Sequence, residues 1–180
     1  MRWRDVGAWW GTTEEERGLA YPCDVALPDW NEGWYRGVDV AAPPAVVFRW
    51  LCQLRAAPYS YDWIDNFGRR SPPRLTPGLE RLEVGQRVMS IFELVSFEPD
   101  RHLTVRVRKP GLFPPLVVSY CVAESSPGHT RLLAKLALRL DDGIRHRIVQ
   151  WLLPWGDWIM MRKQFLTLKR HAERDARSEQ

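Results

Sequence analysis

The spacing of apolar residues changes along the chain, and each change predicts a different kind of element. Within the range 130–140, every second residue from Leu132 to Leu140 is apolar, and the other face carries Arg131, Lys135 and Arg139. This alternation is typical of a strand in an antiparallel sheet that buries one face. A similar period of two predicts further strands at 34–41, 86–97, 103–108 and 116–123.

A helical period flanks this block of strands. Pro43 and Pro44 end the first strand and can begin a helix, because a proline at the first helical position loses no hydrogen bond. Apolar residues follow at helical spacing, namely Val47, Trp50, Leu51 and Leu54. A second short helix is expected from Ser60, as its cap, to Phe67.

The last predicted helix runs from Asp157 to Arg174 and has two contrasting faces. Its apolar face carries Trp158, Met161, Phe165, Leu168 and Ala172. The opposite face carries Arg162, Lys163, Lys169 and Arg170. A strand, two short helices, a run of antiparallel strands and a long helix together predict an α+β fold with that helix packed on one face of the sheet.

Several segments occur in an order that matches a known family. They are WGTTEEE, YRGVDVAAPPAVVFRWLCQL, YSYDWIDNFG, LEVGQRV and MMRKQFLTLKRHAE. From Trp10 to Glu173 the chain resembles the SRPBCC superfamily, the START and birch-pollen-allergen-like group often labelled polyketide cyclase/dehydrase. The resemblance implies a helix-grip fold, in which a curved antiparallel sheet wraps the long C-terminal helix and leaves a cavity between them. The expected organisation is an N-terminal extension at 1–33 that packs on the domain, a helix-grip domain at 34–175 and a disordered tail at 176–180.

Composition narrows the function classes. The chain has 180 residues, of which 45% are hydrophobic and 27% charged, as in a single globular domain. Its net charge of +4 is mildly basic, but the arginines are scattered and form no Lys/Arg block. A nucleic-acid partner is therefore not predicted.

The cysteines, histidines and termini exclude further classes. Cys23, Cys52 and Cys121 are odd in number and form no CxxC pair, which predicts free thiols. The histidines show neither HExxH spacing nor a neighbouring cysteine, so no metal and no cofactor are predicted. The N-terminus lacks the apolar stretch of a signal peptide, and no apolar run reaches the roughly 20 residues of a membrane span. We therefore expect a cytoplasmic protein.

Aromatic side chains with polar tips gather in APYSYDWIDNFG, Ala57 to Gly68. Such residues are costly to bury unless the tip finds a partner, so they suit the wall of a ligand pocket as well as a core corner. The helix face at 157–174 supplies an opposite wall. The predicted ligand-binding residues are Trp50, Tyr59, Tyr61, Trp63, Glu93, Trp158, Met161 and Phe165.

Two carboxylates are candidates for acid–base chemistry. By strand alternation Glu93 shares a face with apolar residues, where a carboxylate must find a partner or shift its pKa upward. It either pairs with an arginine such as Arg106 of the neighbouring strand or points into the cavity. Asp62 either caps its own short helix or forms a polar end to the pocket with a tyrosine hydroxyl.

Three functions follow from these features. The first is binding of a small apolar or aromatic molecule, such as a lipid, polyketide or isoprenoid, in the cavity. The second is a cyclase- or dehydratase-type enzyme in which Glu93, Asp62, Tyr59 or Tyr61 moves protons. The third is a membrane-surface or partner-docking protein that uses the segment IRHRIVQWLLPW. The absence of a recognisable catalytic motif favours the first, and a membrane surface is not the favoured partner.

Overall fold

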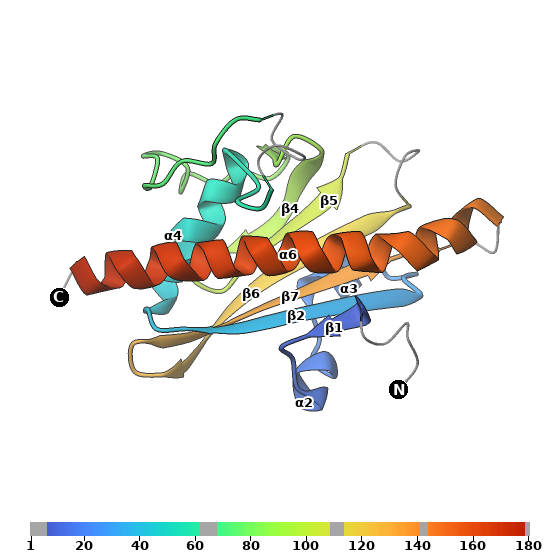
Figure 1. Cartoon of the computed structure of the whole chain (residues 1–180), viewed down its shortest axis with the longest axis horizontal. Coiled ribbons are helices and arrows are strands. Elements are labelled where there is room, and N and C mark those ends of the chain that lie inside the picture. Colours follow the sequence, from blue (N-terminus) through green and yellow to red (C-terminus); the bar gives the residue numbers. More distant parts are fainter. Residues whose placement is uncertain (1–6, 62–67, 109–113, 141–143, 179–180) are drawn as a thin grey trace.

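The structure is a computed structural model of the whole chain and describes residues 7–61, 68–108, 114–140 and 144–178, with side chains of the last range described from Gly156 onward. Its centre is a curved sheet crossed on one face by a long helix (Figure 1). The strands are β1 (Trp9–Trp10), β2 (Glu32–Val40), β3 (Arg87–Val88), β4 (Phe92–Glu98), β5 (His102–Val107), β6 (Leu116–Ser126) and β7 (His129–Leu138).

The strands form one sheet in the order β1-β2-β7-β6-β5-β4-β3. All described neighbours pair antiparallel except β1, whose two residues run parallel to β2. The α+β class and the antiparallel sheet predicted from the alternating residues are confirmed. The expected strand at 86–97 is divided, because Met89 and Ser90 both adopt a positive φ and turn the chain between β3 and β4.

The helices are α2 (Glu14–Arg17), α3 (Pro22–Ala26), α4 (Pro44–Cys52), the 3-10 turn η1 (Gln53–Arg55) and α6 (Ile144–Ser178). Pro44 occupies the first turn of α4, as its sequence predicts. The helix expected at 60–67 falls largely outside the described residues. Among the described residues, no helix is long and apolar enough to cross a membrane.

The C-terminal helix α6 is longer than its sequence indicates. It begins at Ile144, well before the predicted start at Asp157, and continues through Pro154 and Gly156. A proline removes one backbone donor and strains one turn, yet the turns on either side can still bond to one another. At its other end α6 reaches Ser178, past the expected domain boundary at 175, and Ala176 is buried.

The inner face of the sheet, which α4 and α6 cover, holds the main core. Strand residues from β2, β4, β5, β6 and β7 contribute to it, together with the apolar faces of the two helices. On β7 these are Leu132, Ala134, Leu136 and Leu138, the residues whose alternation predicted the strand. The long helix approaches β2 and α4 most closely, and large side chains bridge it to β6.

The outer face of the sheet is covered in part by the N-terminal segment. Tyr21, which precedes α3 as its N-cap, and Cys23 of α3 pack against apolar residues of β6 and β7. Lys135 of β7 points to this face, where its ammonium group pairs with Asp24 at 2.5 Å and lies 3.9 Å from the ring centre of Trp30. A lysine buried among aromatic rings is held by both contacts, so it fastens α3 to the sheet.

Candidate functional site

The candidate site is a pair of buried polar side chains, Tyr120 of β6 and Gln164 of α6, that face each other between the inner face of the sheet and α6. The Tyr120 hydroxyl donates to Gln164 Oε1 at 3.0 Å and lies 3.7 Å from the sulfur of Met161. Tyr120 is 1% exposed and Gln164 is 4% exposed. Burial, followed by the charge of Asp157, raises the pKa of the Tyr120 hydroxyl, so that this group stays a neutral donor.

Gln164 also connects α6 to two loops. Its amide nitrogen donates to the Pro58 carbonyl oxygen at 2.7 Å and lies 3.4 Å from the sulfur of Met89. Both loops contain left-handed backbone: φ is +55° at Tyr59 and +45° at Met89. Non-glycine residues rarely adopt this region, and such strain gathers at functional sites and ligand clamps. The polar pair therefore lies between two strained segments.

A buried ion pair lies on the same face of the sheet. Arg36 of β2 is fully buried, and its guanidinium group contacts Asp157 of α6 at 2.7 Å. The same group donates to the carbonyl oxygens of Ala8 at 2.8 Å and Gly7 at 3.0 Å. Burial raises the pKa of the Asp157 carboxyl although Arg36 opposes the shift, and burial lowers the pKa of Arg36. The Nε atom of Arg36 is buried without a hydrogen-bond partner among the described residues.

Strand register places the ion pair close to the polar pair. Arg36 and Tyr120 are each opposite Ala134 of β7, one from either side. Their Cα atoms are therefore two strand spacings apart, about 9–10 Å. Asp157 and Gln164 are separated by seven residues on α6, which puts both on the helix face turned toward the sheet.

Two of the ligand-binding residues predicted from the sequence, Met161 and Phe165, contact Tyr120 at this site. Met161 is buried and contacts the Tyr120 hydroxyl, and Phe165 is fully buried with its ring centre 6.2 Å from that of Tyr120. Trp158 is half-buried, and the guanidinium group of Arg162 lies 5.6 Å from its ring centre.

Trp50 and Tyr59 belong to a separate aromatic cluster near the C-terminal end of α6. Trp50 stacks on His171 with ring centres 4.6 Å apart, and its indole nitrogen donates to Asp175 at 3.1 Å. Tyr59 meets Trp50 edge-on at 5.8 Å. Burial lowers the pKa of His171, and neighbouring arginines lower it further. The hydrogen bond from the Trp50 indole nitrogen to Asp175 explains why the polar tip of Trp50 can be buried.

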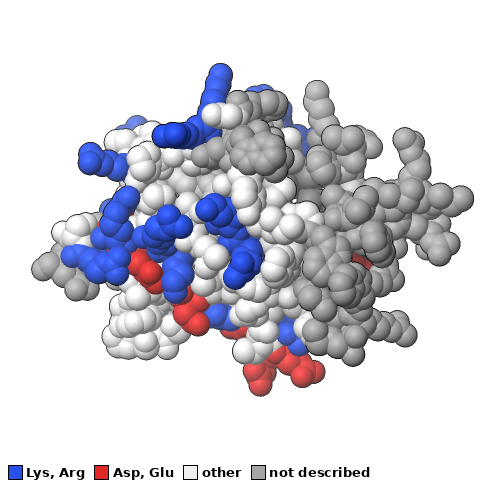
Figure 2. Space-filling view, in the orientation of Figure 1, with Lys and Arg blue, Asp and Glu red and all other residues white. Residues whose placement is uncertain are grey.

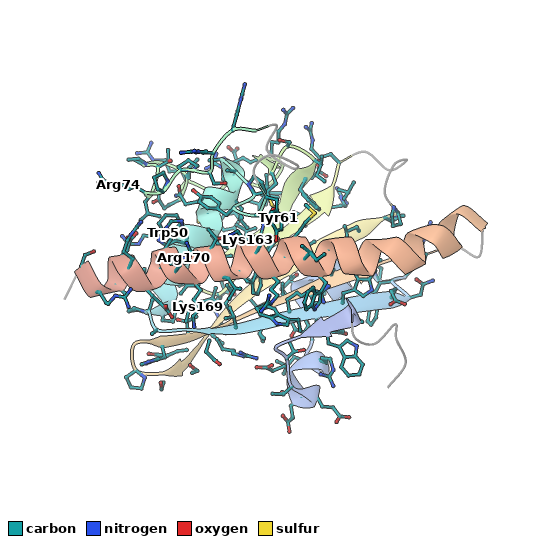
Figure 3. The ribbon with its side chains drawn as sticks, viewed as in Figure 1. Trp50, Tyr61, Arg74, Lys163, Lys169 and Arg170 are labelled. Carbon is teal, nitrogen blue, oxygen red and sulfur yellow. The ribbon has the colours of Figure 1, made fainter. Side chains whose placement is uncertain are left out.

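Tyr61 is half-buried, and Figure 3 shows it on the same side of α6 as Trp50. Trp63 and Asp62 lie outside the described residues.

The structure places Glu93 on the outer face of the sheet. It lies opposite Arg106 in the register of β4 and β5, and the two side chains form an ion pair at 2.7 Å. The pairing with Arg106 was one of the two alternatives for this residue, and the other, a carboxylate in the cavity, does not fit its position. The expected alternation also failed beyond it, because a bulge between Leu94 and Ser96 turns Phe97 toward the core.

Sequence reasoning missed Arg36, Tyr120, Asp157 and Gln164. The available signal was an arginine and a tyrosine on the apolar side of strands, and a glutamine and an aspartate bordering the apolar face of a helix. No group of three or more His, Cys, Asp or Glu side chains with a geometry suited to a metal ion occurs among the described residues.

Comparison with known proteins identifies the fold. No family model matches the sequence, and no curated protein matches it either. Solved structures do match: a Thermobifida fusca protein has a TM-score of 0.51 at 15% identity, covering 79% of this chain and 93% of its own. DynU16, from the dynemicin biosynthetic locus, has a TM-score of 0.51 at 18% identity, covering 79% of this chain and 48% of its own. A Thermus thermophilus protein gives 0.50 at 14% identity, covering 78% of this chain and 96% of its own. The chain has a helix-grip-like fold.

Proposed function

We propose that the protein binds a small apolar or aromatic molecule that carries a polar group, between the inner face of the sheet and α6, and that it is a member of the SRPBCC superfamily. The observation that carries the proposal is the Tyr120–Gln164 pair. Two polar side chains from facing elements meet deep in an apolar interior, beside the sulfur atoms of Met161 and Met89. Ligand pockets commonly combine such a lining with a few placed polar groups.

The energetics of burial support a role beyond packing. A buried hydroxyl or amide contributes little net stability even when it is bonded, so leucine or phenylalanine would serve a pure core as well. Methionine adapts its shape to different neighbours, and Met161 and Met89 flank the polar pair. The unpartnered Arg36 Nε supplies a further buried donor on this face. A ligand oxygen would satisfy it and orient the molecule.

The positions of two described carboxylates favour binding over catalysis. Glu93 is on the outer face of the sheet, and Asp157 of α6, which faces the inner side of the sheet, is held by Arg36. The fold neighbour DynU16 comes from the dynemicin biosynthetic locus. This origin is consistent with a small organic molecule as the ligand class that we propose.

The first test is native mass spectrometry of freshly purified protein, in which we expect a co-purified molecule. The second is titration with anilinonaphthalene sulfonate, an apolar fluorescent probe. The variants Tyr120→Phe and Gln164→Leu should change probe affinity at least fivefold. The matched control is Thr104→Val, which removes a buried hydroxyl that bonds Ser119 across β5 and β6 at 2.9 Å on the outer face. If the parent protein neither retains a molecule nor binds the probe, the proposal is wrong.

A further inference from the structure

The outward side of α6 carries a row of basic residues between Ile159 and Arg177. Residues that point away from the sheet recur three or four positions apart, which keeps them in line along a helix. We call them the α6 stripe, and they are Ile159, Lys163, Leu166, Arg170, Arg174 and Arg177. Figure 2 views the molecule from this side and shows Lys and Arg gathered over the C-terminal half of α6, with the acidic side chains set to its lower edge.

Acidic residues of the described part of α6 lie on its other sides. Asp157 faces Arg36, Asp175 accepts from Trp50, and Glu173 pairs with Lys169 at 3.2 Å. None of these three carboxylates is in the stripe itself.

Three stripe residues carry charge that no described carboxylate compensates. Lys163, Arg170 and Arg177 lie within ion-pair distance of no described carboxylate, whereas Arg174 contacts Asp175 at 2.7 Å. Figure 3 shows Arg74 above the C-terminal half of α6 and Lys169 below it. Cations therefore flank the stripe on both edges, and the surface is broader than one helix.

Apolar residues interrupt the cations. Ile159 is 47% exposed and Leu166 is half-buried. The preceding turns of the same helix carry the sequence IRHRIVQWLLPW, which combines arginine with tryptophan and leucine. Helices of this composition lie in the boundary between lipid headgroups and acyl chains, with cations on the phosphates and apolar groups below them.

We propose that the α6 stripe docks the protein on a bilayer that contains anionic phospholipids. A row of cations on a straight helix matches a flat, negatively charged surface, and the exposed isoleucine suits a bilayer better than it suits the phosphate backbone of a nucleic acid. The stripe lies outside the interior site, so this surface and the binding of a small ligand can be tested separately.

The experiment is co-sedimentation of the full chain with vesicles of phosphatidylcholine, either pure or containing phosphatidylglycerol. We expect binding to the anionic vesicles at low salt, little binding to pure phosphatidylcholine, and weaker binding as salt rises, because exposed charges are screened. The double variant Lys163→Gln/Arg170→Gln should reduce the partition coefficient roughly 25-fold, at about fivefold for each basic residue near an anionic surface.

The matched control is Arg106→Gln/Arg139→Gln, which removes two exposed positive charges from the outer face of the sheet. It should leave vesicle binding within about twofold of the parent, a change well below the fivefold expected for one basic residue at the membrane. Three results would overturn the proposal. The first is no binding of the parent protein to anionic vesicles at low salt, and the second is a loss of vesicle binding in the control variant equal to that in Lys163→Gln/Arg170→Gln. The third is binding of the parent protein to duplex DNA without binding to the vesicles.

Discussion

Replacing either member of the Arg36–Asp157 ion pair tests how strongly α6 is held to the sheet. The pair joins β2 to α6, and Arg36 also binds the carbonyl oxygens of Gly7 and Ala8. Its side chain is 0% exposed and that of Asp157 is 18% exposed. Such a pair is expensive to break from one side, because the remaining charge stays buried without its partner.

The structure sets different costs for the two single changes. Arg36→Met leaves the Asp157 carboxylate unpaired and removes the hydrogen bonds to three backbone carbonyl oxygens, so we expect a loss of about 4–5 kcal/mol in the free energy of unfolding. Asp157→Asn leaves a guanidinium group that three carbonyl oxygens still solvate, at about 2–3 kcal/mol. The double variant has no unpaired charge and should cost about as much as Arg36→Met by itself.

The measurement is urea unfolding of the four proteins at neutral pH, followed by circular dichroism and by tryptophan fluorescence. Coincident transitions would support two-state behaviour, which the comparison requires. We expect a coupling free energy of about 2–3 kcal/mol, at the upper end for residues in contact. Additive losses, within about 0.5 kcal/mol, would refute the buried pair and place both groups in water, where ion pairs are weak.

Further predictions concern single side chains. Burial holds the pKa of His171 below its ordinary 6.5. The unfolded chain therefore binds the proton more tightly, and the free energy of unfolding should fall as pH drops below about 6.5. In thermal unfolding between pH 5 and 8, a His171→Gln variant should show a flatter dependence of stability on pH than the parent protein. Lys135→Met should lower the free energy of unfolding by about 2 kcal/mol through the lost aromatic contacts. Proteolysis should then cut the N-terminal segment faster than the rest of the domain. Uniform cleavage would contradict a role of Lys135 in holding α3 on the sheet. Phe165→Ala should cost about 3–5 kcal/mol in urea unfolding because the ring is fully buried, and Trp158→Ala should cost less because that ring is half-buried; equal losses would be inconsistent with these environments.

Local patterns predicted most of the fold. The alternation on β7 identified the strand and its buried face, and Pro44 with the spaced apolar residues after it identified α4. At the start of α2, Thr13 and Glu16 form a capping box in which each side chain accepts from the backbone N–H of the other residue. Each of these elements is decided by residues within a few positions of one another, which a pattern can capture.

Features that depend on a neighbouring strand were not predictable in this way. A bulge after Leu94 reverses which side chains face the core, so parity arguments from Glu93 to Phe97 failed. The polar site was missed for a related reason. The hydrogen-bond partners of Gln164 are Tyr120, more than forty positions away, and Pro58 on a third segment. A pattern read along α6 alone does not show either partner. Met161 and Phe165 were found because their own helix face marks them as buried.

The two polar contacts between sheet and helix fix how α6 is aligned. Apolar side chains tolerate a helix that slides or rotates by one turn, since one methyl group packs against another with a similar gain. Arg36 and Tyr120 are different, because each is buried and needs its own partner, Asp157 or Gln164. Those partners are two turns apart, about 10 Å along the helix, so each of the two sheet residues contacts a different turn of α6. A shift of α6 by one turn would leave both sheet residues without partners at once. This alignment brings Met161 to the Tyr120 hydroxyl, so the contacts that position the helix also assemble the proposed ligand site.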